Sequence, residues 1–139
     1  ALKLAEESAA ANQVSVRAVQ GDVFEEMARL DTAKEKFDIV LADPPPFVKS
    51  RTDLEPGAKA YRKLARLSAE IAAPGGLLLL ASCSHNIPLD RFAAECAAGI
   101  LKSGRSASLI HSAGAGADHP VHPMLPETAY LKALVYALD

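Results

Sequence analysis

Two predicted strand ends carry residue types that could do chemistry. Phe37–Ala42 is typical of an apolar strand, and it runs directly into Asp43, Pro44 and Pro45. Proline has no amide hydrogen and fixes φ, so these prolines end strand pairing and leave Asp43 and the Pro44 and Pro45 carbonyls at the lip of a sheet. A carboxylate there could bind the polar edge of a ligand. The alternative is a proline-rich loop that merely stops a strand.

The second strand end carries a cysteine. Leu77–Ser82 is an apolar run that suits a buried strand, and it is followed by Cys83, Ser84 and His85. A thiolate nucleophile needs partial exposure and a positively charged neighbourhood, which His85 or the start of the next helix could supply. The alternative for Cys83 is a buried apolar cysteine, the commoner fate of a lone cysteine. Cys96 lies among alanines in a predicted helix and is expected to be structural.

A third polar strand end is predicted at Gly21-Asp22-Val23-Phe24, after a short strand over Val14–Gln20. The Asp22 carboxylate could receive an amino group or a ribose hydroxyl of a nucleotide-like ligand, and the Phe24 side chain could cover a ring. The alternative is that Asp22, with Glu25 three residues later, caps the next helix and needs no ligand.

The elements that would position these residues alternate between helices and strands. Helices are predicted over 1–11, 24–30, 58–72 and 89–101, and strands over 14–20, 37–42, 77–82, 106–111 and 129–138. This alternation predicts an α/β fold with a mostly parallel sheet and crossover helices, in which the final pair of strands, joined by the loop 112–128, can be antiparallel. Because the carboxyl ends of parallel strands open onto one edge, the three polar strand ends should lie on the same side of the sheet.

The composition restricts the partners and the location. The 139 residues suit one domain, and the formal net charge is −2, so a polyanion must be held by a local basic surface. No apolar run approaches the roughly 20 residues that cross a bilayer, and the first residues do not have the order of a secretory signal. A cytoplasmic protein without a membrane partner is expected. The candidate basic surface consists of Lys49, Arg51, Lys59, Arg62, Lys63 and Arg66, although a solvated helix face explains four of these six equally well.

A metal site is not expected. Cys83 and Cys96 form no close-spaced metal or redox motif. His111, His119 and His122 could suggest a site, but they show no recurrent ligand spacing, and the neighbouring prolines make the backbone irregular.

Taken together, the motifs resemble a known family. The segments G-D-V-F, F-D-I-V-L-A-D-P-P-P-F, G-G-L-L-L-L-A-S-C-S-H and A-D-H-P-V-H-P-M-L-P-E-T-A-Y-L-K, in this order and spacing, resemble the C-terminal catalytic part of bacterial S-adenosylmethionine-dependent rRNA methyltransferases. The likeness is greatest to the large-subunit rRNA cytosine-5 methyltransferases that carry an N-terminal PUA domain, and it covers essentially the entire chain. It implies a Rossmann-like class I methyltransferase sheet, S-adenosyl-L-methionine as cofactor and rRNA as partner.

The resemblance also implies roles for individual residues. Asp22 would bind the adenine amino group of the cofactor, with Val23 and Phe24 beside the ring. Asp43 and Pro44 would face both the methyl donor and the target base, and Cys83 would attack the cytosine ring as the nucleophile. The residues expected to contact the substrate are Pro45, Phe47, Lys49, Ser84 and His85.

The chain also departs from the family pattern. Residues 1–139 contain neither the first strand with its Gly-rich cofactor loop, nor the second strand with an acid for the ribose, nor a PUA domain. We therefore interpret them as a partial methyltransferase catalytic domain, lacking the first two strands of its sheet, which binds cofactor weakly or not at all. An exposed apolar edge is expected on the strand around Ile39, where another chain, and thus a homodimer partner, could pack.

Two other functions are compatible with the sequence. One is a methyltransferase acting on a base or protein nitrogen, in which Cys83 would be only structural. The other is a non-catalytic binding or dimerisation module, favoured by the missing cofactor loop.

Overall fold

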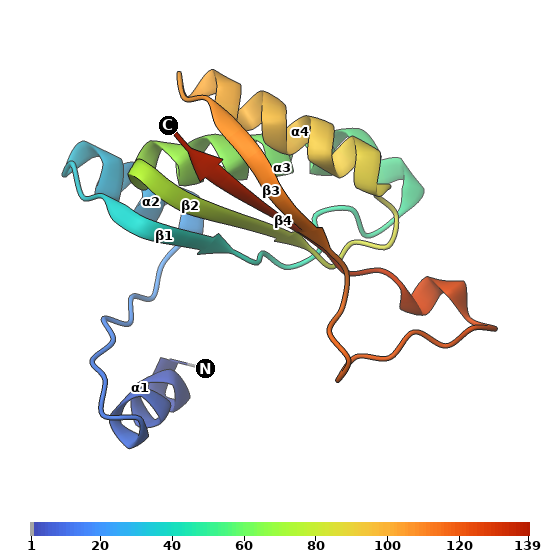
Figure 1. The fold of residues 1–139 in the computed structure, drawn as a ribbon, viewed down its shortest axis with the longest axis horizontal. Coiled ribbons are helices and arrows are strands. Elements are labelled where there is room, and N and C mark those ends of the chain that lie inside the picture. Colours follow the sequence, from blue (N-terminus) through green and yellow to red (C-terminus); the bar gives the residue numbers. More distant parts are fainter. Residues whose placement is uncertain (1) are drawn as a thin grey trace.

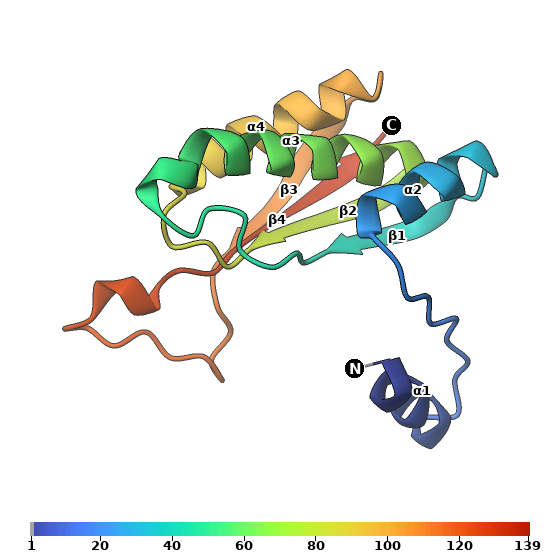
Figure 2. The ribbon, with the colours of Figure 1, turned by 180° about the vertical axis from the view of Figure 1, so that it is seen from behind.

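A four-stranded sheet with helices on one face forms the body of the molecule (Figure 1). The computed structural model describes residues 2–139. Helices α2, α3 and α4 cover one face of the sheet, whereas α1 lies apart from it at the end of an extended segment (Figure 2). In chain order the elements are α1 (Leu2–Ala11), α2 (Val23–Thr32), β1 (Phe37–Ala42), the 3-10 turn η1 (Arg51–Asp53), α3 (Leu54–Ile71), β2 (Ala72–Ser82), α4 (Leu89–Lys102), β3 (Ala107–Ala113), the 3-10 turn η2 (Pro126–Thr128) and β4 (Lys132–Leu138).

The sheet has the order β1-β2-β4-β3. Strands β1 and β2 are parallel neighbours, and β4 is antiparallel to both β2 and β3. Strands β1, β2 and β3 therefore run in one direction and β4 in the other. This arrangement confirms the predicted α/β fold with an antiparallel last strand. The sheet is mixed, because β1 and β2 pair in parallel and both neighbours of β4 pair with it antiparallel.

The prediction of a strand over Val14–Gln20 is wrong. These residues form an extended loop that pairs with no strand of the described chain, and Val14, Val16 and Val19 are 61%, 51% and 47% exposed. Alternating apolar residues favour a strand, but a strand forms only where a neighbour satisfies its amides and covers its side chains.

Strand β1 is the edge of the sheet that the sequence predicted to be exposed. Val40 and Ala42 point into the core beneath the helices, whereas Ile39 and Leu41 on the opposite face are each 66% exposed. The strand thus has one buried and one open apolar face.

Helix α3 begins earlier than the predicted residue 58. The backbone and hydroxyl of Ser50 both donate to the Asp53 carboxylate, which stabilises the turn that leads into Leu54. Pro56 is tolerated because the first helical turn needs no amide donor. The helix therefore starts right after the loop that leaves β1, and this tightens the connection near Asp43.

Close contact between α3 and α4 completes the core. A Cβ at Gly99 would lie 2.4 Å from the Arg62 carbonyl oxygen and 2.7 Å from the Ala65 Cβ, so the absence of a side chain lets the two helices touch. The largest fully buried side chains come from both helices, from the sheet and from the loop before α4; they are Tyr61, Phe92, Leu78, Leu80, Leu134 and Ile87. Among residues 2–139, no helix has the length and apolar character needed to cross a membrane.

Candidate functional site

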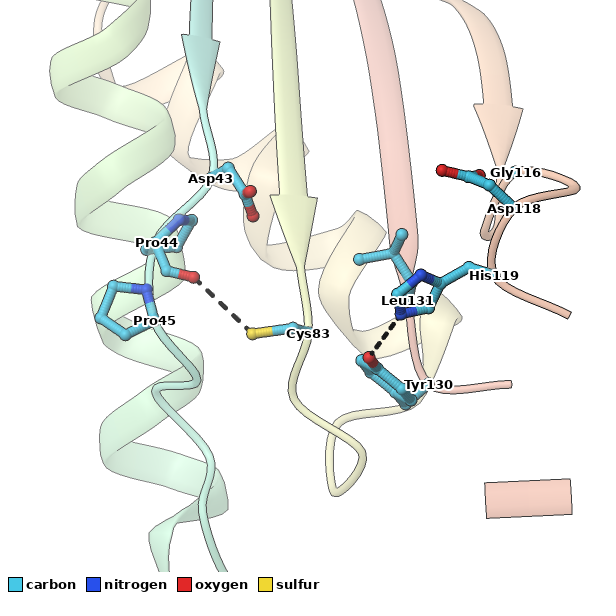
Figure 3. A pocket seen from close by; sticks show the side chains of 9 residues that line it. All are labelled: Asp43, Pro44, Pro45, Cys83, Gly116, Asp118, His119, Tyr130 and Leu131. Carbon is cyan, nitrogen blue, oxygen red and sulfur yellow. Dashed lines mark hydrogen bonds between the residues drawn. The ribbon is translucent and has the colours of Figure 1, made fainter. Parts of the chain in front are cut away.

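The parallel strands β1 and β2 end beside one cavity, of about 450 Å³ (Figure 3). One wall carries residues that follow these strands, and the other carries residues of the loop before β4 and of the approach to that strand. The lining residues are Asp43, Pro44, Pro45, Cys83, Gly116, Asp118, His119, Tyr130 and Leu131. The structure thus brings together Asp43 and Cys83, which the sequence placed at two separate strand ends.

Cys83 is partly exposed and faces the Asp43 loop. Its thiol lies 3.8 Å from the Pro44 carbonyl oxygen, in the geometry of a weak S–H donor (Figure 3). Cys96, in contrast, lies in the core and is 1% exposed, and burial raises the pKa of its thiol. The interpretation as a buried apolar cysteine therefore applies to Cys96, and Cys83 is the accessible thiol.

The two serines beside Cys83 form a buried frame around Tyr61. The Ser82 hydroxyl donates to the Tyr61 hydroxyl at 2.8 Å, and the Tyr61 and Ser84 hydroxyls share a hydrogen bond of 2.7 Å. The Ser84 amide in turn donates to the Ser82 hydroxyl at 3.2 Å. Because side chains alternate along an extended backbone, fixing both serines inward turns Cys83 outward.

The same frame reaches the loop after β1. The Val48 amide donates to the Ser84 hydroxyl at 3.2 Å, and Ser84 is 1% exposed. The structure therefore places the Ser84 side chain in the core and not in the cavity, where the sequence predicted a substrate contact. Its hydroxyl holds the loop of Asp43 against the loop of Cys83.

A row of aromatic rings links α2 to this frame. The Phe24 and Phe47 ring centroids are 6.2 Å apart, those of Phe47 and Tyr61 are 4.8 Å apart, and those of Tyr61 and Phe92 are 5.1 Å apart. The Lys63 ammonium lies 4.4 Å from the Phe24 ring centroid. Phe47, predicted to contact the substrate, thus packs between Phe24 of α2 and Tyr61 of α3 and does not line the Asp43 cavity.

Asp22 caps helix α2. Its Oδ1 accepts hydrogen bonds from the amides of Phe24 at 2.9 Å and Glu25 at 3.1 Å, so the helix-cap alternative describes the structure. Asp22 and Phe24 line a second hollow of about 460 Å³ with Lys63 and other residues, separate from the Asp43 cavity. Val23 is 47% exposed at the start of the helix and does not line either hollow.

Of the remaining predicted substrate contacts, Pro45 lines the Asp43 cavity, whereas His85 and Lys49 do not. His85 is exposed and lines a neighbouring hollow of about 510 Å³, whose wall includes Leu131 and Lys132. Lys49 is exposed, and its carbonyl accepts a hydrogen bond of 2.9 Å from the Asn86 amide group. Pro45 is exposed and lines the Asp43 cavity, so its contact with the substrate stays a prediction.

Several residues at the site received no role from the sequence. The His119 Nε2 and the Tyr130 hydroxyl are 3.3 Å apart on the wall opposite Cys83 (Figure 3). Lys132 lies behind this wall, and its Nζ donates to the Ser84 and Tyr130 carbonyls at 2.8 Å each. The sequence marked these residues only as members of the late motif D-H-P…Y-L-K. Which side chains and carbonyls they contact depends on residues far away in the sequence.

Basic side chains gather on the outer surface of α3. A hollow of about 330 Å³ is lined by Lys59, Arg62, Lys63, Arg66 and Lys102. Four of these were predicted as a basic surface, whereas Lys49 and Arg51 lie outside the hollow. Within residues 2–139, no group of three or more His, Cys, Asp or Glu side chains is arranged to hold a metal ion.

Two of these cations have carboxylate partners. Arg62 pairs with Glu95 at 2.6 Å, and Arg66 pairs with Glu70 at 2.6 Å. Burial opposes the charge of Glu95, but hydrogen bonds from Arg62 and Arg91 outweigh it and keep the pKa of this carboxyl below its usual range.

Comparison with known proteins finds relatives by sequence. No protein-family model matches the chain. Ribosomal RNA large subunit methyltransferase I of Serratia proteamaculans is 35% identical over 135 residues, which cover 95% of this chain and 34% of that protein. The protein of the same name from Yersinia pseudotuberculosis is 36% identical over 114 residues, which cover 82% of this chain and 29% of that protein. The chain thus spans about a third of the length of the curated relatives it matches.

Solved structures show the same fold. A crystal structure of a protein assigned as a methyltransferase, complexed with SAH, has a TM-score of 0.78 at 22% identity, and covers 97% of this chain and 36% of that one. A Streptococcus mutans protein assigned as a SAM-dependent methyltransferase has a TM-score of 0.79 at 24% identity, with 97% and 35% covered. The chain therefore has the Rossmann-like α/β fold of these structures, and its homologues by sequence are large-subunit rRNA methyltransferases.

Proposed function

We propose that this chain is part of the catalytic domain of an S-adenosylmethionine-dependent rRNA methyltransferase, and that the parent enzyme methylates carbon 5 of a cytosine in large-subunit rRNA. The observation that carries the proposal is the cavity in which Asp43 and the accessible thiol of Cys83 lie at the carboxyl ends of two parallel strands. Open α/β sheets bind their ligands at this edge. The relatives named as large-subunit rRNA methyltransferases support the choice of substrate.

The described residues fit one end of the cofactor. Phe24 offers a ring face in the hollow that it shares with Asp22, and the Asp22 carboxylate has one oxygen besides the one that caps α2. These two residues would hold the adenine ring and its amino group. When bound, S-adenosyl-L-methionine supplies the methyl group. Groups for its ribose and methionine parts would come from the rest of the parent protein, so this chain alone should bind the cofactor weakly.

Cys83 would act as the nucleophile. Carbon 5 of cytosine is a poor nucleophile, but addition of the Cys83 thiolate to carbon 6 forms a C–S bond and makes carbon 5 enamine-like. After carbon 5 has gained the methyl group, a base takes the proton from carbon 5, the C–S bond breaks, and its electron pair returns to Cys83 as the thiolate. Asp43 would bind the polar edge of the base while charge develops on it.

The basic surface on α3 would bind the RNA backbone. Lys59, Arg62, Lys63 and Arg66 follow the i, i+3, i+4, i+7 spacing of one helix face, which extends about 10 Å at 1.5 Å per residue. Phosphates of a polynucleotide are the anions that such a row of cations suits. Because the chain carries a formal net charge of −2, binding would depend on this local surface.

Location and assembly follow from the same proposal. An rRNA substrate fits a cytoplasmic enzyme. Ile39 and Leu41, on the open face of β1, are where a further segment of the parent protein or a second copy would pack.

Trapping of the covalent adduct tests the chemistry. The parent protein would be incubated with S-adenosylmethionine and an rRNA fragment containing 5-fluorocytosine, whose fluorine blocks the final elimination. A stable protein–RNA adduct is expected, and Cys83→Ala should abolish it while Cys96→Ala leaves it intact. If Cys83→Ala retains methyl transfer, the enzyme is nitrogen-directed, and Asp43 and the Pro44 carbonyl accept hydrogen bonds from the amine.

Calorimetric titration with S-adenosylhomocysteine tests the cofactor. Binding by the parent protein and much weaker binding by residues 1–139 alone is the expected result. Absence of binding by the parent protein would contradict the proposal and favour a non-catalytic binding or dimerisation module.

A further inference from the structure

Lys132 links the two sides of the cavity through backbone carbonyls, without lining the cavity itself. It is the first residue of β4 and lies opposite Ser82 in the antiparallel ladder. Its Nζ donates to the Ser84 carbonyl and to the Tyr130 carbonyl, at 2.8 Å each. One acceptor directly follows Cys83 in the chain and the other belongs to a residue that lines the cavity. A single ammonium group therefore holds the cysteine loop against the start of β4.

The ammonium group is half-buried and hydrogen-bonds to the carbonyl of Ser84, the residue that follows Cys83. Burial lowers the pKa of Lys132, and the nearby Cys83 acts in the opposite direction. Among the ion pairs of residues 2–139, none involves Lys132. Its two acceptors are neutral carbonyls, so its positive charge is not cancelled at the site. A cation in such a place stabilises an anion beside it more than a solvated cation would.

We propose that Lys132 is a positioning residue for Cys83, which fixes the cysteine loop through two carbonyls and stabilises the thiolate form of the nucleophile. The inference rests on the proposed function, in which the Cys83 thiolate is the nucleophile. The hydrogen bonds of Lys132 are present without cofactor or RNA.

Other titratable groups face the thiol and set the balance in which Lys132 acts. Asp43 and Asp118 line the same cavity, and their two carboxylates disfavour a further negative charge there. His119 and Tyr130 lie on the opposite wall, and His85 is exposed just beyond Cys83. Within residues 2–139, Lys132 is the Lys or Arg side chain that hydrogen-bonds to the cysteine loop (residues 83–85), and this singles it out as the counter-charge.

Alkylation of Cys83 by iodoacetamide tests the proposal on residues 1–139 themselves. The chain has two cysteines, and Cys96 is 1% exposed, so the folded protein should react at Cys83 alone, which peptide mass spectrometry verifies. The rate would be measured from pH 6 to pH 10.5 for the unchanged chain, Lys132→Met, Lys132→Arg and a control, Lys3→Met. The Lys3 side chain is 89% exposed on α1.

The expected result is a loss that depends on pH. Lys132→Met should slow alkylation about tenfold near pH 7.5, the effect of removing one unit charge close to a partly buried thiol. The difference in rate between Lys132→Met and the unchanged chain should narrow as the pH rises to 10.5. Lys132→Arg should recover most of the rate, and Lys3→Met should match the unchanged chain.

Two outcomes would overturn the proposal. Alkylation of Lys132→Met within twofold of the unchanged chain at every pH would show that its charge does not reach the thiol. A fall by one constant factor at all pH values would show a purely structural effect. Circular dichroism would show whether Lys132→Met folds. If it does not, the alkylation rates of Lys132→Arg and Lys132→Gln are compared instead, and equal rates at every pH would overturn the proposal. Because alkylation needs neither cofactor nor RNA, its result is independent of whether methyl transfer is found.

Discussion

Removal of the Tyr61 hydroxyl should destabilise the protein by about 2–3 kcal/mol. This hydroxyl bonds to Ser82 at 2.8 Å and Ser84 at 2.7 Å, and all three residues are at most 1% exposed. Tyr61→Phe keeps the ring but removes one hydrogen-bond partner from each of two buried serine hydroxyls, which then keep only the bonds that they accept from the Val48 and Ser84 amides. Each net hydrogen bond is worth about 1 kcal/mol, and a buried polar group left unsatisfied costs about 1–3 kcal/mol. Two such groups would together cost about 2–6 kcal/mol, and the lower end, about 2–3 kcal/mol, is expected because each serine hydroxyl keeps one other hydrogen bond.

Tyr136→Phe is a matched control. Tyr136 is also buried, at 5% exposure, but on the described chain its hydroxyl takes part in no hydrogen bond. Urea unfolding followed by far-ultraviolet circular dichroism would give the free energy of unfolding of both variants. The control should change this free energy by no more than about 0.5 kcal/mol.

Tyr61→Phe should also alter the reactivity of Cys83. With Ser82 and Ser84 no longer held inward, the thiol loses its fixed direction, and its alkylation rate at pH 8 should change by a factor of about two or more while Cys96 stays protected. A free-energy change equal to that of Tyr136→Phe, together with an unchanged alkylation rate, would refute the reasoning that this hydroxyl frame positions Cys83.

Three further changes test the packing and the electrostatics. Gly99→Ala should destabilise the protein in urea by about 1–3 kcal/mol although alanine favours helices, because the added Cβ would meet the Arg62 carbonyl at 2.4 Å; a gain in stability would contradict the close helix contact. Ser68→Ala should leave the free energy of unfolding unchanged or raise it by up to about 1 kcal/mol, because the Ser68 hydroxyl is buried without a partner on the described chain; a loss above 1 kcal/mol would reveal a missing partner. A hydrogen bond from Arg105 lowers the pKa of Asp139 to about 2. Its carboxylate therefore stabilises the fold above the unfolded-state pKa near 4, and this contribution is lost as pH falls from about 4 to 2. Asp139→Asn should flatten that part of a curve of unfolding free energy against pH, and an unchanged curve would show that the pair contributes nothing.

The sequence predicted the strand ends better than the surroundings of the site. Phe37–Ala42 has the predicted bounds, because an apolar run stopped by prolines depends on local rules alone. The same rules placed Asp43 and Cys83 on one edge of the sheet, since parallel strands end on the same side. Segments with strong local signals are therefore the ones that the sequence located correctly.

The remaining features depend on contacts between distant parts of the chain. Val14–Gln20 has the residues of a strand but no strand to pair with on the described chain, so its sequence pattern alone could not decide its structure. Lys132 reaches Ser84 across 48 positions of sequence, and only the placement of β4 beside β2 creates that contact. The sequence marked Lys132 as part of a motif but could not show what it touches.

The serines around Cys83 show how the same residues serve fold and chemistry. In a strand, residues at i and i+2 share a face, so two inward serines force the residue between them outward. Tyr61 comes from α3, which begins soon after the Asp43 loop, and Ser84 also binds the Val48 amide of that loop. The hydroxyl frame therefore couples the carboxylate loop to the thiol loop through buried contacts that solvent does not weaken. A substitution in this frame should consequently change stability and thiol reactivity together, whereas one at Asp43 should change only the chemistry of the cavity.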